Sequence, residues 1–302
     1  MDSELMKKIG IYINFEKPTF ENGLKVWRVG RKKYIYSEGG ITFHDFIRDV
    51  LIEAVGSDWV ESQKKLSAEN QHFIVQCISY LEELRNKLIL QSGKPVSHVS
   101  VLVDGRIASL QSLAFDVYSL LSVSNIPSSL LARLRIKDQY QGARYEILVA
   151  AIMLRLGFTI DWLDEKNKSE SHCEFIATHN ESSTKIAVEA KTRRRPGGIL
   201  HTSEFADLND ASMYKGDVQR LLRDALKKPE CGKMSYIVFI DVNVPVTKDD
   251  PKNVPWMKDI LNEVYTSKFG LDSNLSECNA IYFTNLLYNY HDNMEPAAGQ
   301  NL

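Results

Sequence analysis

The chain has 302 residues, and its 37 lysines and arginines against 39 aspartates and glutamates give a net charge of −2. This balance excludes a polybasic protein that coats nucleic acid through bulk charge, although it leaves room for a local basic groove. Hydrophobic residues make up 44% and charged residues 25%, as in ordinary globular proteins, and no apolar run is long enough for a transmembrane helix, so we expect no membrane partner.

The cysteines are few and scattered, at Cys77, Cys173, Cys231 and Cys278, and no CxxC pair occurs. This spacing predicts neither a disulfide framework nor a structural zinc site. His172 and Cys173 are adjacent, but neighbours in a strand point to opposite faces and so make a poor metal pair. The N-terminus has no signal-peptide pattern, and we therefore expect a cytoplasmic protein.

Residues 1–125 predict a mainly helical N-terminal module. Residues 24–36 are typical of one or two short strands. Thr42 caps a helix whose apolar residues recur at helical spacing, and further helices are expected from Ser67 and over 107–123. The module carries no catalytic motif, and it could serve packing, dimerisation or target recognition.

A second domain is expected over residues 126–292, followed by a disordered tail over 293–302. Its elements are, in chain order, a helix over 138–156, strands over 158–163, 172–178 and 185–193, a helix over 212–228, a strand over 233–244, a helix near 256–268 and a strand over 279–285. Short polar turns predict antiparallel hairpins among the first three strands. The later helix predicts a right-handed parallel crossover, so the fold class is α/β with a mixed central sheet flanked by helices.

Two carboxylates stand out in this domain. Glu146 lies within an apolar helix, where a buried carboxylate is costly unless it is paired, bound to metal or protonated. It could pair with an arginine or a sheet lysine, or point at a charged site. In KIAVEAKTR, Glu189 and Lys191 are two residues apart and share one strand face. Such a pair often marks only a solvated strand edge.

The preceding strand supplies a third charged residue, Glu174. A short turn would bring Glu174 beside Glu189, and a divalent cation relieves the repulsion between two such carboxylates. Oxygen ligands favour Mg²⁺ or Mn²⁺ over zinc. Asp161, one strand earlier, is an alternative ligand.

The ordered set GARYEILVAAIMLRLGF, CEF and VEAKTR, over about residues 138–245, resembles the PD-(D/E)XK nuclease superfamily. The resemblance implies a restriction-endonuclease-like α-β-β-β-α-β fold and a Mg²⁺-dependent nuclease, with Mn²⁺ as a substitute. By this resemblance Glu174, Glu189 and the carbonyl of Ala190 would bind the metal.

The same resemblance gives Lys191 the role of orienting or deprotonating the attacking water and stabilising the charge on phosphorus. Glu146 would bind a second metal or hold Lys191 in place. One departure is that Cys173-Glu174 stands where the superfamily usually has Pro-Asp. The longer side chain could shift the metal. The alternatives are therefore a catalytically inactive nucleic-acid-binding or scaffold subunit and, third, a small-molecule phosphoesterase on the same fold.

Basic residues follow the Glu-x-Lys strand and favour DNA as the partner, ahead of RNA. Arginine is well shaped for phosphate contacts, although solvated strand ends and helix faces carry the same residues. The candidates for contact with nucleic acid are Arg193, Arg194, Arg195, Lys215, Gln219 and Arg220. A single catalytic site cuts one strand, so cutting both strands would require a homodimer or sequential nicking.

Overall fold

The computed structural model describes residues 17–37, 41–93, 99–101, 103–163, 172–194, 217–244, 256–258, 260–261 and 278–286. The described residues up to Ala143 form one compact unit, the N-terminal unit, and those from Arg144 onward form a second, the C-terminal unit. The division falls inside helix α7 (Lys137–Arg155), whereas the sequence placed a boundary after residue 125. The tail expected over 293–302 lies outside the described residues.

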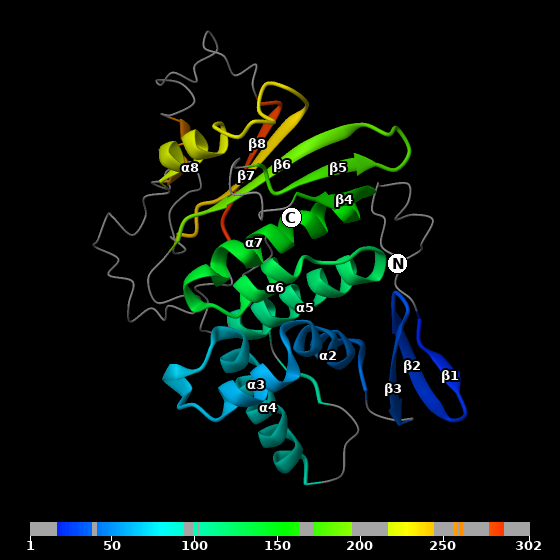
Figure 1. Ribbon diagram of the computed structural model, residues 1–302. Coiled ribbons are helices and arrows are strands. Elements are labelled where there is room, and N and C mark those ends of the chain that lie inside the picture. The colour runs from blue at the N-terminus through cyan, green and yellow to red at the C-terminus, as the bar shows by residue number, and fades with distance from the viewer. Residues whose placement is uncertain are drawn as a thin grey trace. The chain divides into compact units, whose positions relative to one another are not determined.

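The N-terminal unit combines a small sheet with helices (Figure 1). Its elements are the antiparallel strands β1 (Thr19–Glu21), β2 (Leu24–Val29) and β3 (Lys32–Ser37), then α2 (Phe43–Val55), α3 (Ser57–Lys64), a 3₁₀ turn (Ala68–Asn70), α4 (Phe73–Ser92), α5 (Gly105–Val123) and α6 (Ser128–Leu134). The helix expected from Ser67 begins later, at Phe73, because the residues after Ser67 form the 3₁₀ turn.

Helix α2 begins where the sequence predicts, since Thr42 and Asp45 form a reciprocal capping box. The Asp45 N–H donates to Thr42 Oγ1 at 3.2 Å, and the Thr42 N–H donates to the Asp45 carboxylate at 3.1 Å. The small sheet packs on this helix through Trp27, whose ring stacks on Phe46 with centroids 4.9 Å apart. The sheet therefore has an apolar face buried against α2.

The C-terminal unit is built around a five-stranded sheet in the order β4-β5-β6-β7-β8. These strands are β4 (Phe158–Trp162), β5 (Phe175–His179), β6 (Lys185–Thr192), β7 (Tyr236–Asp241) and β8 (Ala280–Thr284). The first three pair antiparallel, and β6–β7 and β7–β8 pair parallel. The predicted α/β class, the antiparallel hairpins and the mixed sheet are confirmed. Of the helix expected near 256–268, only 256–258 and 260–261 are described, and they are helical.

One face of this sheet lies under helix α8 (Val218–Ala225). Of the helix expected over 212–228, residues 212–216 lie outside the described residues, and residues 217 and 226–228 are not helical. Its residues Leu221, Leu222 and Ala225 form one core cluster with the sheet residues Ala187, Tyr236, Val238 and Ile240. Glu189 pairs with Val238 in the parallel register, and Lys191 pairs with Ile240. Paired residues share a face, so Glu189 and Lys191 lie on the side that α8 covers.

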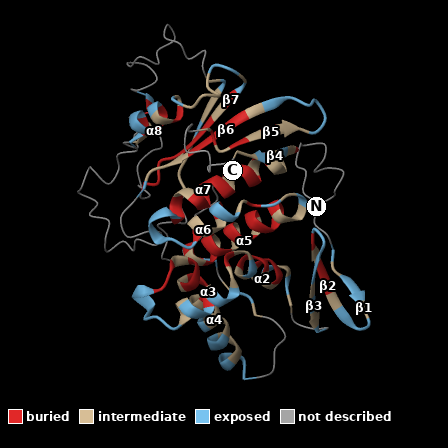
Figure 2. Ribbon diagram, in the orientation of Figure 1, coloured by how far each residue is buried: buried red, intermediate tan, exposed pale blue. Residues whose placement is uncertain are grey.

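Helix α7 meets the opposite face of the sheet. Tyr145 Oη on α7 lies 2.8 Å from Thr284 Oγ1 on β8. In the parallel registers of the sheet, Thr284 lies beside Asp241 on β7, and Asp241 lies beside Thr192 on β6. Because Thr192 is next to Lys191 in the strand, it points away from the α8 side. Figure 2 shows buried residues along both α7 and the central strands. Gly157, with a φ of 87°, ends the helical stretch and turns the chain into β4.

No helix in the described ranges combines the length and the apolar character needed to cross a membrane.

Candidate active site

Three of the residues predicted from sequence come together here: Glu189 and Lys191 on β6, and Glu174 immediately before β5. The β5–β6 ladder ends at the Phe175–Val188 pair, and the Glu174 N–H donates to the Val188 carbonyl at 3.1 Å, so Glu174 lies at the end of the ladder where Glu189 continues β6. Lys191 Nζ forms an ion pair with Glu189 and lies 3.8 Å from Glu174 Oε1. The Glu189 side chain is fully buried, and those of Glu174 and Lys191 are 14% and 23% exposed. The group is thus sheltered, with Lys191 as its most accessible member.

The carboxylates and the lysine shift one another's pKa values. Burial, and then the charge of Glu174, raise the pKa of Glu189 to about 7, although two lysines work against this rise. For Lys191, burial favours the neutral amine, but Glu189 and Glu174 outweigh it and raise the pKa above its usual value. Lys191 therefore keeps its proton at neutral pH, and the carboxylates remain the groups that gain most from an added cation.

Glu146 joins this group through its charge. It is buried on α7, next to Tyr145, which packs on the face of the sheet opposite to α8. Its charge also helps to raise the pKa of Lys191, so it lies within electrostatic range of the ammonium. Glu146, Glu174 and Glu189 thus all act electrostatically on the Lys191 ammonium.

Lys228 was not singled out as a site residue from sequence, where it was one of several basic residues near a helix end. Its Nζ lies 3.6 Å from Glu189 Oε1 and donates to the His172 carbonyl oxygen at 2.7 Å. Two residues further on, Glu230 Oε1 lies 2.7 Å from His172 Nδ1, and Glu230 Oε2 accepts from the Cys173 N–H at 3.0 Å. The turn after α8, which we call the 228–230 clamp, therefore holds the segment that carries Glu174.

The backbone adds one further oxygen to the site, the carbonyl of Ala190. The N–H groups of Ala187 and Arg193 donate to β7. Successive residues of a strand direct their backbone groups to opposite neighbours, so the odd-numbered residues of β6 face β7 and Ala190 directs its carbonyl toward the β5 side. The nearby Cys173 N–H donates to Glu230 Oε2 at 3.0 Å. The Ala190 carbonyl thus faces the region beside Glu174.

This donor set fits a hard cation. Both Glu189 oxygens are buried, and Oε1 forms ion pairs with Lys191 and Lys228, while neither oxygen accepts a hydrogen bond of regular geometry among the described residues. Two carboxylates and a backbone carbonyl are the oxygen ligands that Mg²⁺ accepts, with water completing its shell. No group of three or more His, Cys, Asp or Glu side chains placed to hold a metal occurs within the described part of the chain. A cation here would therefore depend on Glu174, Glu189 and Ala190.

The alternative ligand Asp161 is not brought to this group. It is exposed on β4, where it pairs with Ile176, and β5 separates its strand from β6. A role in the Glu189 site would require a rearrangement of the sheet.

The residues predicted to contact nucleic acid differ in how exposed their side chains are. Arg193 is only 13% exposed, and its Nε lies 3.0 Å from Asp217 Oδ2, so it ties the end of β6 to the start of α8. Arg194 and Gln219 are exposed. Arg220 is exposed and lies 3.9 Å from Asp217. Arg195 and Lys215 lie outside the described residues.

Comparison with known proteins assigns no family, because no protein-family model, curated protein or solved structure matches the chain. The function must therefore be inferred from the chemistry of the site.

Proposed function

We propose that the chain is a metal-dependent nuclease that hydrolyses phosphodiester bonds in DNA, with a C-terminal unit of restriction-endonuclease-like topology. The contact of Lys191 with both Glu174 and Glu189, on adjoining strands, carries this proposal. The order of elements supports it: a helix with Glu146, three antiparallel strands, Glu-x-Lys on the third, then a helix and a parallel strand.

Each residue of the group has a role in this chemistry. Glu174, Glu189 and the Ala190 carbonyl would hold Mg²⁺, for which Mn²⁺ can substitute. The bound ion supplies Lewis-acid stabilisation and lowers the pKa of water. Lys191, as a protonated ammonium, would orient the attacking water and offset the negative charge that builds on the phosphate. Glu146 would keep the Lys191 ammonium charged and in place, since its carboxylate favours that state.

The exposed cations suit a DNA backbone as the substrate. Arg194 and Arg220 are accessible and can approach phosphate oxygens, whereas Arg193 acts through its ion pair with Asp217 to hold the end of β6. One such site per chain cuts one strand, so double-strand cleavage would require two copies.

The test is cleavage of plasmid DNA by the purified chain with and without Mg²⁺. The variants Glu189→Gln and Lys191→Met should each lower the rate by at least about 10²-fold, since each removes charge that acts in the transition state. Lys233→Met is the matched control, because Lys233 is exposed on the turn before β7 and should leave the rate unchanged. Full activity in Lys191→Met would overturn the proposed site.

A catalytically inactive, DNA-binding or scaffold subunit is the second candidate. The observation that favours it is that Lys191 already bridges both carboxylates, which gives the pair a counter-ion without any metal. Calorimetric titration with Mg²⁺ and Mn²⁺ separates the two candidates. A scaffold shows no metal binding that depends on Glu174 and Glu189, whereas a nuclease does.

A further inference from the structure

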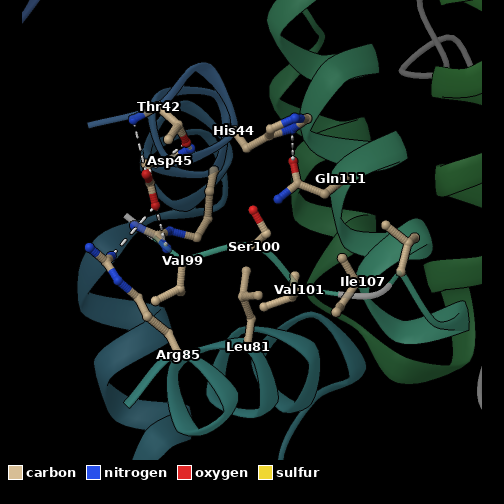
Figure 3. A pocket seen from close by; sticks show the side chains of 12 residues that line it. Thr42, His44, Asp45, Leu81, Arg85, Val99, Ser100, Val101, Ile107 and Gln111 are labelled. Atoms are coloured by element: carbon tan, nitrogen blue, oxygen red, sulfur yellow. Dashed lines mark hydrogen bonds and ion pairs between the residues drawn. The ribbon is translucent and has the colours of Figure 1, made fainter. Parts of the chain in front are cut away.

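A cavity of about 370 Å³ lies within the N-terminal unit, and its lining comes from α2, α4, α5 and the segment before α5 (Figure 3). Its volume is in the range of small-molecule sites. All of its lining residues belong to the N-terminal unit, so it is separate from the Glu189 group. The proposed nuclease chemistry gives it no role.

One wall of this cavity is aliphatic. Leu81 of α4 and Ile107 of α5 contribute to it, together with three valines at alternate positions, Val99, Val101 and Val103. All three valines line the cavity and present apolar surface to it. Val103 is 60% exposed, and a hydrocarbon ligand would remove part of that surface from water.

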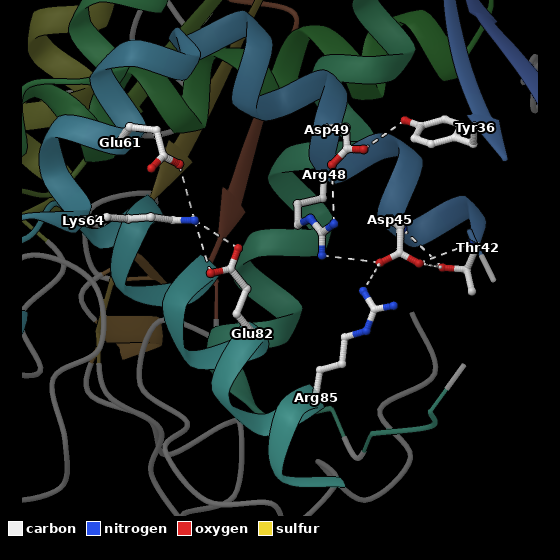
Figure 4. Close-up of polar contacts among 9 residues, drawn as sticks. All are labelled: Tyr36, Thr42, Asp45, Arg48, Asp49, Glu61, Lys64, Glu82 and Arg85. Atoms are coloured by element: carbon white, nitrogen blue, oxygen red, sulfur yellow. Dashed lines mark hydrogen bonds and ion pairs between the residues drawn. The ribbon is translucent and has the colours of Figure 1, made fainter. Parts of the chain in front are cut away.

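Another part of the lining carries charge. Asp45 lies between two arginines, with its Oδ1 3.3 Å from Arg48 Nη1 and 3.6 Å from Arg85 Nη1 (Figure 4). The other Asp45 oxygen is held by the capping box with Thr42. Arg48 also lies 3.4 Å from Asp49, which does not line the cavity. The lining residues thus carry two guanidinium groups and one carboxylate, and Asp49 outside the lining pairs with Arg48, so Arg85 is the arginine that shares a carboxylate with another cation.

Two donors remain on this charged wall. Arg48 Nε is buried and has no hydrogen-bond partner among the described residues. The Arg85 side chain is 36% exposed, and its ion pair with Asp45 is long. Beside them, His44 Nδ1 lies 3.1 Å from Gln111 Oε1, which fixes two further polar side chains at the cavity. Arg85 is therefore the group best placed to receive an anion.

We propose that this cavity binds a small carboxylate with an apolar hydrocarbon body. The carboxylate would pair with the Arg85 guanidinium, and the hydrocarbon would lie against Leu81, Val101 and Ile107. A phosphate ester, with a charge of about −1.5 to −2, would be repelled more strongly by Asp45.

The test uses octanoate as the probe, with octanol as a neutral match of equal chain length and octyl phosphate as the more highly charged match. Each is titrated calorimetrically into the full chain. We expect one octanoate site with an affinity at least about tenfold above those of octanol and octyl phosphate, the effect of one charged hydrogen bond. The proposal is overturned if octanol binds equally well, if octyl phosphate binds better, or if octanoate does not bind up to about 10 mM.

Variants locate the site. Arg85→Gln should weaken octanoate binding about tenfold and leave octanol binding unchanged, since only the charged contact is lost. Val101→Asp should weaken both. Arg31→Gln, at an exposed arginine in the turn between β2 and β3, is the matched control and should change neither. Circular dichroism checks that each variant is folded. Unchanged octanoate binding in folded Arg85→Gln would contradict the assignment.

Discussion

Lys228 and Glu189 meet although they belong to different elements: the ammonium on the turn after α8 lies 3.6 Å from the fully buried carboxylate on β6. The same ammonium donates to the His172 carbonyl at 2.7 Å. One side chain therefore links a helix end, the central strand and the segment that leads into β5. The position of Glu174 relative to Glu189 depends on this link as well as on the sheet.

The variant Lys228→Met tests this link. The variant leaves the buried Glu189 carboxylate with one cation fewer. Because a buried charge without its partner is destabilising, we expect the free energy of unfolding to fall by about 3 kcal/mol. Urea denaturation measures the loss. Lys227→Met is the matched control, because Lys227 is 67% exposed and pairs only with Asp224 among the described residues, so its loss should be within about 0.5 kcal/mol. Equal stability of the two variants would show that Lys228 does not balance the charge of Glu189.

Glu174→Gln probes the metal site without changing the shape of the side chain. The amide removes one charged ligand and should weaken Mg²⁺ and Mn²⁺ binding at least about tenfold in calorimetric titration. It should also lower the pKa of Glu189, because the charge of Glu174 is one cause of its rise to about 7. Glu181→Gln, in the exposed turn between β5 and β6, serves as the control. Metal affinity that is the same in both variants would count against the site.

The meeting of Glu174, Glu189 and Lys191 follows from local rules that a sequence reveals. Alternation puts Glu189 and Lys191 on one face, and the short turn between β5 and β6 fixes a register that ends at the Phe175–Val188 pair and so leaves Glu174 next to Glu189. These relations depend on residues close in the chain. The α/β class could be predicted for the same reason, since each element carries its own periodicity.

The 228–230 clamp could not be predicted in this way. Its contacts join His172 to Lys228 and Glu230 across a long stretch of sequence, and they depend on how α8 returns to the sheet. No spacing in the chain encodes that return. The ion pair between Arg193 and Asp217 could not be predicted for the same reason. Arg193, which was expected to contact phosphate, is largely buried instead.

Thr42→Ala tests the capping box of α2. It removes the hydroxyl that accepts from the Asp45 N–H, and this loss should lower the free energy of unfolding by about 1 kcal/mol. Thr42→Ser keeps the hydroxyl and should retain most of the stability. Thermal or urea unfolding of the three proteins gives the comparison, and equal losses in both variants would show that the methyl group, and not the cap, is responsible.

His72 should make the stability of the protein depend on pH. Its ring is buried against Trp59 and Tyr140, and burial, with a smaller effect of Lys137, lowers the pKa to about 4. In the unfolded chain the pKa is about 6.5, so between pH 6.5 and 4 the unfolded state takes up the proton first. The contribution of neutral His72 to the free energy of unfolding is therefore complete above about pH 6.5. It falls by up to about 3 kcal/mol as the pH drops to 4.

The variant His72→Asn isolates this effect, because asparagine does not titrate and can still accept the Ile74 N–H that His72 Nδ1 accepts at 3.3 Å. Urea denaturation at several pH values should show a flatter dependence between pH 4 and 6.5 in this variant than in the parent protein. Parallel pH curves for His72→Asn and the parent would show that His72 is not held neutral by the fold.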